Sequence, residues 1–104
     1  MLTINELWSL CYDNCIAITK HAKVRLAERV ISIGDIQNAI NTGEIIEQYE
    51  NDKPFPSCLL LGLTKSNKQI HIVVSIDNGY LYIITAYYPD ANEWETDLKT
   101  RKGQ

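Results

Sequence analysis

The chain has 104 residues and a net charge of −3, and 45% of its residues are hydrophobic and 22% are charged. This length allows one domain with a single hydrophobic core but not a second. The composition is that of an ordinary globular protein. A membrane-spanning helix is excluded because no apolar run approaches the roughly 18 residues it needs. The first residues also lack the basic and apolar regions of a signal peptide, so we expect no membrane association.

The cysteines and histidines do not form a metal-binding pattern. Cys11, Cys15 and Cys58 are an odd number and contain no Cys-x-x-Cys motif, which is typical of reduced thiols in a cytoplasmic protein. His21 and His71 are far apart in sequence and neither lies in a pair with the spacing of zinc ligands. We therefore expect neither a metal nor another cofactor.

Helices are expected in the first part of the chain. The apolar positions indicate a helix over 5–13, followed by a short extended link over 16–18. Thr19 is a good N-cap for a second helix over 20–30. A third helix begins after Ser32, which forms a capping-box pair with Asp35. This third helix ends before Gly43, since glycine is common just beyond the C-terminal end of a helix.

The remainder of the chain alternates with the period of β-strands. A strand over 44–50 is followed by a proline-containing turn over 52–56. Three more strands are expected over 57–64, 69–77 and 80–88. The resulting class is α+β, with the N-terminal helices packed on one face of a mainly antiparallel four-stranded sheet. Residues 1–104 form a single domain.

Two predicted hairpin loops set the register of the last three strands. Asn78-Gly79 is a typical two-residue loop, and it places His71 opposite Ala86. A second two-residue loop at Ser66-Asn67 would place Gly62 opposite His71. Directly paired residues share a face, so the predicted core face carries Leu59, Leu61, Leu63, Ile70, Ile72, Val74, Ile76, Leu81 and Ile83. The other face, which includes Tyr82 and Tyr88, is free to bind a ligand.

One helix carries a polar stripe beside its apolar face. His21, Arg25, Glu28 and Arg29 fall within an arc of roughly 100°. Arg25 and Arg29 suit phosphate oxygens, His21 is a candidate for proton transfer, and Glu28 can orient an arginine or act as a base. The alternative is a solvent-exposed helix face with one ion pair between Arg25 and Glu28.

Three further observations bear on function. His71 is either a hydrogen-bonded strand histidine or a catalytic group, and Gly62 opposite it would leave room for a ligand. The acidic net charge disfavours a nucleic-acid-binding protein. However, residues 44–57 hold four acidic residues against Lys53 alone, so a basic site can exist elsewhere on the surface.

Several segments together resemble a small bacterial family, the domain of unknown function number forty-two fifty-eight. The resemblance begins with Ile18-Thr-Lys-His-Ala-Lys-Val-Arg-Leu-Ala-Glu-Arg29 and continues in Pro54-Phe-Pro-Ser-Cys-Leu-Leu-Leu-Gly62, His71-Ile-Val-Val74 and Ile84-Thr-Ala-Tyr87. It extends to Pro89, Trp94 and Arg101, so residues 18–101 form a family-like core after an N-terminal helix and link over 1–17. The chain departs from the family at Val30, where members often have glycine.

This resemblance implies a fold similar to RelE-like toxins and the activity of a metal-independent endoribonuclease. It also implies an RNA substrate and a partner protein of the zinc-finger antitoxin type. It places the site on His21, Arg25, Glu28, Arg29, His71, Tyr87 and Arg101. In this hypothesis Arg25, Arg29 and Arg101 bind phosphate. The catalytic residues are His21, Arg25, Glu28, His71 and Tyr87.

Two alternatives stay open beside this hypothesis. The first is a non-catalytic module that binds protein or nucleic acid on the sheet face with Tyr82 and Tyr88. The second is a purely structural stripe that holds the helix to the C-terminal segment, for example through Glu28 and Arg101. The strand parity also places Tyr87 and His71 on different faces. A shared site therefore requires that Tyr87 lies past the end of the sheet or that a bulge intervenes.

Overall fold

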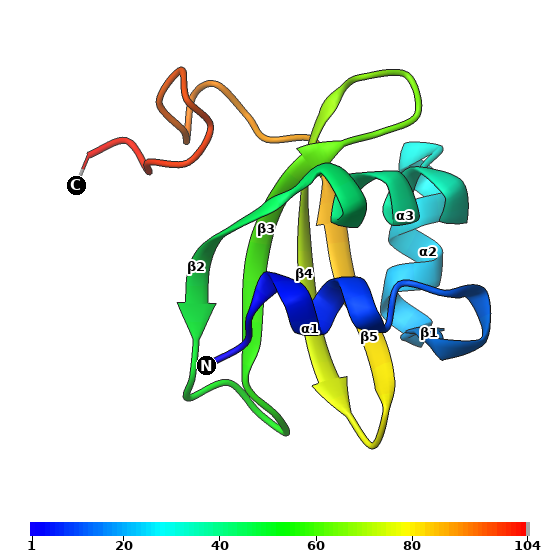
Figure 1. Ribbon diagram of the computed structural model, residues 1–104. Helices are drawn as coiled ribbons and strands as arrows, with labels where there is room; N and C mark the ends of the chain where they lie inside the picture. The colour runs from blue at the N-terminus through cyan, green and yellow to red at the C-terminus, as the bar shows by residue number, and fades with distance from the viewer. Residues whose placement is uncertain (104) are drawn as a thin grey trace.

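The computed structural model describes residues 1–103 and shows helices lying over one face of a five-stranded sheet (Figure 1). The α+β class is therefore confirmed. The elements in chain order are α1 (Ile4–Ser9), a 3-10 turn η1 (Asp13–Cys15), β1 (Ile16–Ile18), α2 (Lys20–Arg29), α3 (Ile33–Thr42), β2 (Glu44–Tyr49), β3 (Ser57–Leu63), β4 (Gln69–Asp77) and β5 (Tyr80–Tyr87).

The sheet has one strand more than predicted. Its order is β1-β5-β4-β3-β2, and the neighbours are antiparallel except for β1, which runs parallel to β5. The prediction of four strands was wrong because residues 16–18 were interpreted as an extended link. Their backbone in fact pairs with the free edge of β5, with Ile16 opposite Leu81 and Ile18 opposite Ile83.

The predicted helix caps are confirmed at both helices that cover the sheet. The side chain of Thr19 accepts a hydrogen bond from the backbone N–H of Ala22 at the start of α2. Ser32 and Asp35 form a reciprocal capping box at the start of α3. Gly43 follows α3 with φ −92°, an extended conformation. Glycine is therefore required here by close packing and not by its backbone conformation, since a Cβ at this position would lie 2.2 Å from the Leu60 side chain.

The predicted register is wrong for β3. The loop between β3 and β4 has three residues, Lys65 to Asn67, and Asn67 adopts a left-handed conformation with φ 63°. The extra loop residue shifts the pairing by one, so Leu61 lies opposite His71. A shift of one residue exchanges the two faces of a strand.

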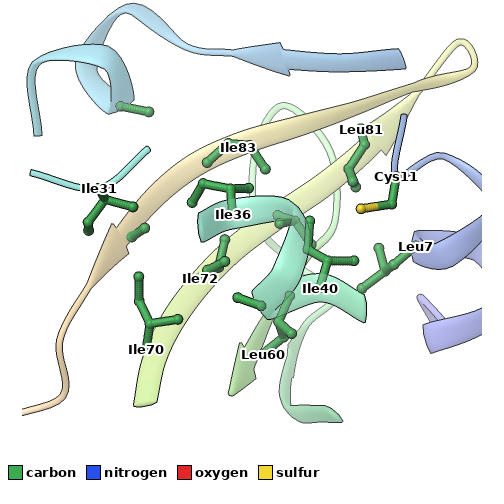
Figure 2. Packing of buried hydrophobic residues seen from close by; sticks show 14 of the residues in the cluster. Leu7, Cys11, Ile31, Ile36, Ile40, Leu60, Ile70, Ile72, Leu81 and Ile83 are labelled. Atoms are coloured by element: carbon green, nitrogen blue, oxygen red, sulfur yellow. The ribbon is translucent and has the colours of Figure 1, made fainter. Parts of the chain in front are cut away.

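The helix-covered face of the sheet therefore differs from the predicted one in β3. It carries Cys58 and Leu60 from β3, while Leu59 and Leu61 lie on the opposite face. In β4 and β5 the prediction is confirmed for the buried residues Ile70, Ile72, Val74, Leu81 and Ile83. Figure 2 shows Ile36 and Ile40 of α3 packed against this surface, with Leu7 and Cys11 closing its side.

A β-bulge at Ile84 resolves the predicted conflict between His71 and Tyr87. Val74 pairs with Ile83 and Val73 pairs with Thr85, so one residue of β5 is left unpaired. The bulge brings Tyr87 opposite His71 and turns Ala86 into the helix-covered core. Of the two arrangements that would let Tyr87 and His71 share an environment, the structure shows the bulge.

The C-terminal segment, residues 89–103, covers part of the second face. The chain closes on itself there through an antiparallel bridge between Trp94 and Arg101. Trp94 is 2% exposed and packs edge-on against the ring of His71, with centroids 4.5 Å apart. In Figure 1 this segment lies at the end of the sheet opposite to the loop between β2 and β3.

Candidate functional site

The residues predicted to form one site lie in three different environments. His71, Tyr87 and Arg101 belong to a cluster beneath the C-terminal segment, while Arg29 contacts β5. His21, Arg25 and Glu28 are on the exposed side of α2. No hydrogen bond or ion pair within residues 1–103 joins the helix stripe to His71 or Arg101.

His71 is a buried histidine whose two ring nitrogens are both engaged. Its Nε2 lies 2.7 Å from the carbonyl oxygen of Leu98, and its Nδ1 lies 3.2 Å from the hydroxyl of Tyr87. Since a carbonyl can only accept, Nε2 carries the proton and Nδ1 accepts from Tyr87. Burial lowers the pKa of the imidazole below its ordinary value. A neutral histidine with both ring nitrogens hydrogen-bonded in this way holds the C-terminal segment in place.

An ion pair next to His71 completes the cluster. Arg101 donates to both carboxylate oxygens of Glu47, at 3.0 and 3.1 Å, and its guanidinium stacks on Trp94. Tyr49 also donates to Glu47. Burial alone would raise the pKa of Glu47, but the hydrogen bonds from Arg101 and Tyr49 hold it below its ordinary value.

These contacts occupy the polar groups of His71, Tyr87 and Arg101 that catalysis or phosphate binding would require. Arg101, which was predicted to bind phosphate, forms an ion pair with the carboxylate of Glu47. Its partner is therefore not Glu28, the example given for a structural stripe. Tyr87 is bonded to His71, and burial raises the pKa of its hydroxyl. The cluster therefore anchors the C-terminal segment to the sheet. The contacts of His71 are those of the hydrogen-bonded strand histidine that the sequence left open as an alternative.

The helix stripe divides into an anchored end and a free end. Arg29 donates from Nη1 to the carbonyl oxygen of Ala86 at 2.7 Å and so ties α2 to β5. Arg25 and Glu28 form a single contact of 3.5 Å, with 54% of each side chain exposed. An ion pair this exposed contributes little to stability. His21 is exposed, and its imidazole makes no hydrogen bond to any residue within 1–103.

His21 borders an apolar cleft that the sequence did not predict. The cleft has a volume of about 540 Å³, within the usual range for small-molecule sites. Its floor is formed by Ser75, Tyr82 and Ile84 of the second sheet face. One wall is formed by Thr19 and His21, and the other by the loop of residues 52–55.

The cleft and the His71 cluster lie on the same face of the sheet but at different ends. Ser75 is four residues from His71 along β4, or ~13 Å at the rise of a strand. The sequence placed His21 and His71 on opposite sides of the sheet. Both in fact border the second face, but their hydrogen bonds and neighbours are not shared.

The helix beside the cleft is basic, although the chain is acidic. α2 contains four of the ten Lys and Arg residues together with His21, against Glu28 alone. His21, Arg25 and Arg29 follow one another at intervals of four residues, which places them one helical turn apart on one side of the helix. We name these three residues the basic row. The opposite wall of the cleft carries one cation, Lys53, and one carboxylate, Asp52.

Some residues of the cleft were foreseen and others were not. Tyr82 was assigned to the binding face, and its pairing with Ser75 follows from the Asn78-Gly79 hairpin, which the structure confirms. Phe55 and Lys53 were interpreted only as part of a turn. Their placement over the strands depends on the course of the loop between β2 and β3, which no local pattern encodes.

A family model described as a domain of unknown function (DUF4258) matches residues 18–88, so the chain belongs to that family. The matched range contains α2, α3 and the strands from β2 to β5. No curated protein and no solved structure matches the chain. Within residues 1–103, no helix is long and apolar enough to cross a membrane.

Proposed function

We propose that this member of the DUF4258 family is a binding domain for single-stranded RNA. The observation that supports the proposal is an apolar, tyrosine-floored cleft that opens beside a basic helix in an otherwise acidic chain. Proteins that bind single strands combine aromatic surfaces for the bases with cations that follow the backbone. Tyr82 provides the aromatic surface, and Arg25 and Arg29 of the basic row together with Lys53 provide the cations.

The contacts of each arginine define its part in this proposal. Arg25 has only one weak, exposed ion pair, so its guanidinium can turn to a phosphate with little loss. Arg29 uses one of its five N–H donors on Ala86, and its remaining donors extend the basic row along β5. The proposal does not use Arg101 and His71, because their polar groups bond within the C-terminal cluster.

The proposal is tested by fluorescence anisotropy with an unstructured 12-nucleotide RNA. The native chain is expected to bind, and Arg25→Glu is expected to weaken binding roughly tenfold or more, because it replaces an attraction to phosphate by a repulsion. Lys102→Glu makes the same charge change in the C-terminal segment and is the matched control. Absence of RNA binding by the native chain, or equal losses in both variants, would sink the proposal.

RNA cleavage is a second candidate function, favoured by the position of His21. This side chain is exposed at the edge of the cleft and lies one turn from Arg25. Attack by a 2′-hydroxyl requires a base and a cation that stabilises the pentavalent phosphate. In this hypothesis His21 is the base and Arg25 the cation, and the domain is the toxin of a pair whose partner is a zinc-finger antitoxin.

Cleavage is distinguished from binding by a time course on end-labelled RNA. His21→Ala is expected to abolish cleavage while it retains most of the affinity, because the phosphate contacts of Arg25 remain. Unchanged cleavage in His21→Ala would rule out the assignment. Binding without cleavage by the native chain would leave the domain a non-catalytic module.

A further inference from the structure

The hydroxyl of Ser75 stands out among the polar groups of the sheet. Ser75 is 5% exposed, yet its Oγ has no hydrogen-bond partner within residues 1–103. The neighbouring Ser57, which is also buried, donates its hydroxyl to the carboxylate of Asp52 at 2.6 Å. No buried side-chain N or O atom within residues 1–103 lacks a partner, so this unbonded Oγ is open to the cleft, where it can donate to or accept from a ligand. Ser75 lies in the floor of the cleft, so a ligand that fills the cleft would cover this hydroxyl and would have to supply its hydrogen-bond partner.

We infer that the cleft recognises a single nucleobase, with Ser75 as the specificity-determining residue. This inference rests on the proposed RNA binding and adds a base preference to it. A base fits the chemistry of the floor because its flat face can lie against Tyr82 while a polar edge atom bonds to Ser75. Tyr82 is the direct cross-strand partner of Ser75, so the ring and the hydroxyl are adjacent on one face.

A nucleobase suits this cleft better than the apolar side chain of a partner protein. An apolar side chain would fill the volume but leave the hydroxyl of Ser75 buried and unpaired. A nucleotide also brings a phosphate, which can accept a hydrogen bond from His21 on one wall and pair with Lys53 on the other. Asp52 is the one acidic residue of the lining, and its carboxylate is already occupied by Ser57 and by the backbone N–H of Lys53.

If Ser75 reads the base, removal of its hydroxyl would abolish the preference among bases but not all binding to RNA. The basic row holds phosphates, which are identical in every sequence and carry no base information. A hydrogen bond at the base edge adds affinity only for bases that present a complementary atom. Affinity and preference therefore depend on different residues and can be changed separately.

The test measures the affinities of the native chain, Ser75→Ala and Ser75→Thr for four 6-nucleotide homopolymers of RNA and for an abasic oligomer. The native chain is expected to prefer one base about five- to tenfold, the gain of one neutral hydrogen bond. Ser75→Ala is expected to lose this preference while binding of the disfavoured oligomers changes less than about twofold. Ser75→Thr keeps the hydroxyl and should retain the preference, and Ser66→Ala in an exposed loop is the control.

The possible outcomes distinguish the inference of base recognition from the proposal of RNA binding on which it rests. If folded Ser75→Ala keeps the native preference, Ser75 does not read the base. If the abasic oligomer binds as tightly as the others, no base occupies the cleft, although the RNA-binding proposal stands. If no oligomer binds, both fail. Should Ser75→Ala not fold, Tyr82→Ala provides the second test, since it should remove the advantage of every base over the abasic oligomer, whereas Tyr82→Phe should keep it.

Discussion

Val30 ends α2 in a left-handed conformation, with φ 55° and ψ 49°, and its side chain is 85% exposed. A β-branched residue is strained in this region, whereas glycine adopts it freely. We expect Val30→Gly to raise the free energy of unfolding by about 1 kcal/mol, because relief of strain exceeds the added entropy of the unfolded chain. Val24→Gly, on the exposed side of the same helix, should instead lower it by about 0.5–1 kcal/mol. Urea denaturation measures both, and a loss at Val30 would contradict the strain.

Protonation of His71 should weaken the fold in mildly acidic solution. Burial keeps its folded-state pKa below the unfolded value of 6.5. The unfolded chain therefore binds the extra proton first as the pH falls, and stability declines below about pH 6.5 until the folded pKa is reached. The slope is at most about 1.4 kcal/mol per pH unit for one proton.

The pH effect is checked by urea denaturation of the native chain and His71→Gln between pH 7.5 and 5. We expect His71→Gln to be less stable at pH 7.5 by about 1–3 kcal/mol, through loss of the contacts to Leu98 and Tyr87. Its stability should then change less across this range. His21→Gln is the control, and it should retain the native pH dependence. A slope equal to the native one in His71→Gln would assign the effect to another group.

At the scale of elements, the C-terminal segment behaves as part of the fold. Trp94 is buried between His71 and Arg101, and the segment is also tied to β2 by an ion pair of 2.6 Å between Lys99 and Glu44. We expect Trp94→Ala to lower the free energy of unfolding by about 3–5 kcal/mol. Trp8→Ala should cost less, because Trp8 is 41% exposed. Equal losses in thermal or urea unfolding would show that the segment is not anchored through Trp94.

The packing of α3 on β3 depends on a missing side chain at Gly62. A Cβ at this position would lie 2.0 Å from the backbone oxygen of Ala39, so the helix would have to move away from the sheet. We expect Gly62→Ala to destabilise the fold by at least about 1–3 kcal/mol. At Gly34 the added atom meets only the flexible end of Lys65, so Gly34→Ala should be tolerated. Comparable melting temperatures for the two variants would disprove this account of the interface.

Gly62 also shows how far local sequence patterns determine the elements. The caps at Thr19 and Ser32 and the Asn78-Gly79 hairpin were predictable, since each depends on residues close in sequence. The role of Gly62 was predicted incorrectly, as room for a ligand beside His71. One extra loop residue at Lys65 reversed the faces of β3, and the glycine faces α3 instead. A register error of one residue is enough to exchange a ligand site for a helix contact.

For the whole molecule, the candidate site was predictable only in part. The stripe on α2 and the tyrosine on the second face were both visible in the sequence. Their meeting at a cleft was not, because it requires the parallel pairing of β1 with β5 and the placement of Phe55 and Lys53 by a loop. The histidine pair was separated for the same reason, since Trp94 and Leu98 cover His71 from a segment distant in sequence.

The central claim, that the basic row holds the phosphates of single-stranded RNA, is tested most directly by the salt dependence of RNA affinity. Each phosphate contact on a single strand contributes about −0.7 to the slope of log K against log salt concentration. The account predicts a negative slope for the native chain, a slope shallower by about 0.7 for Arg25→Ala, and no change for Lys102→Ala. A native slope near zero, or one that Arg25→Ala leaves unaltered, would contradict it.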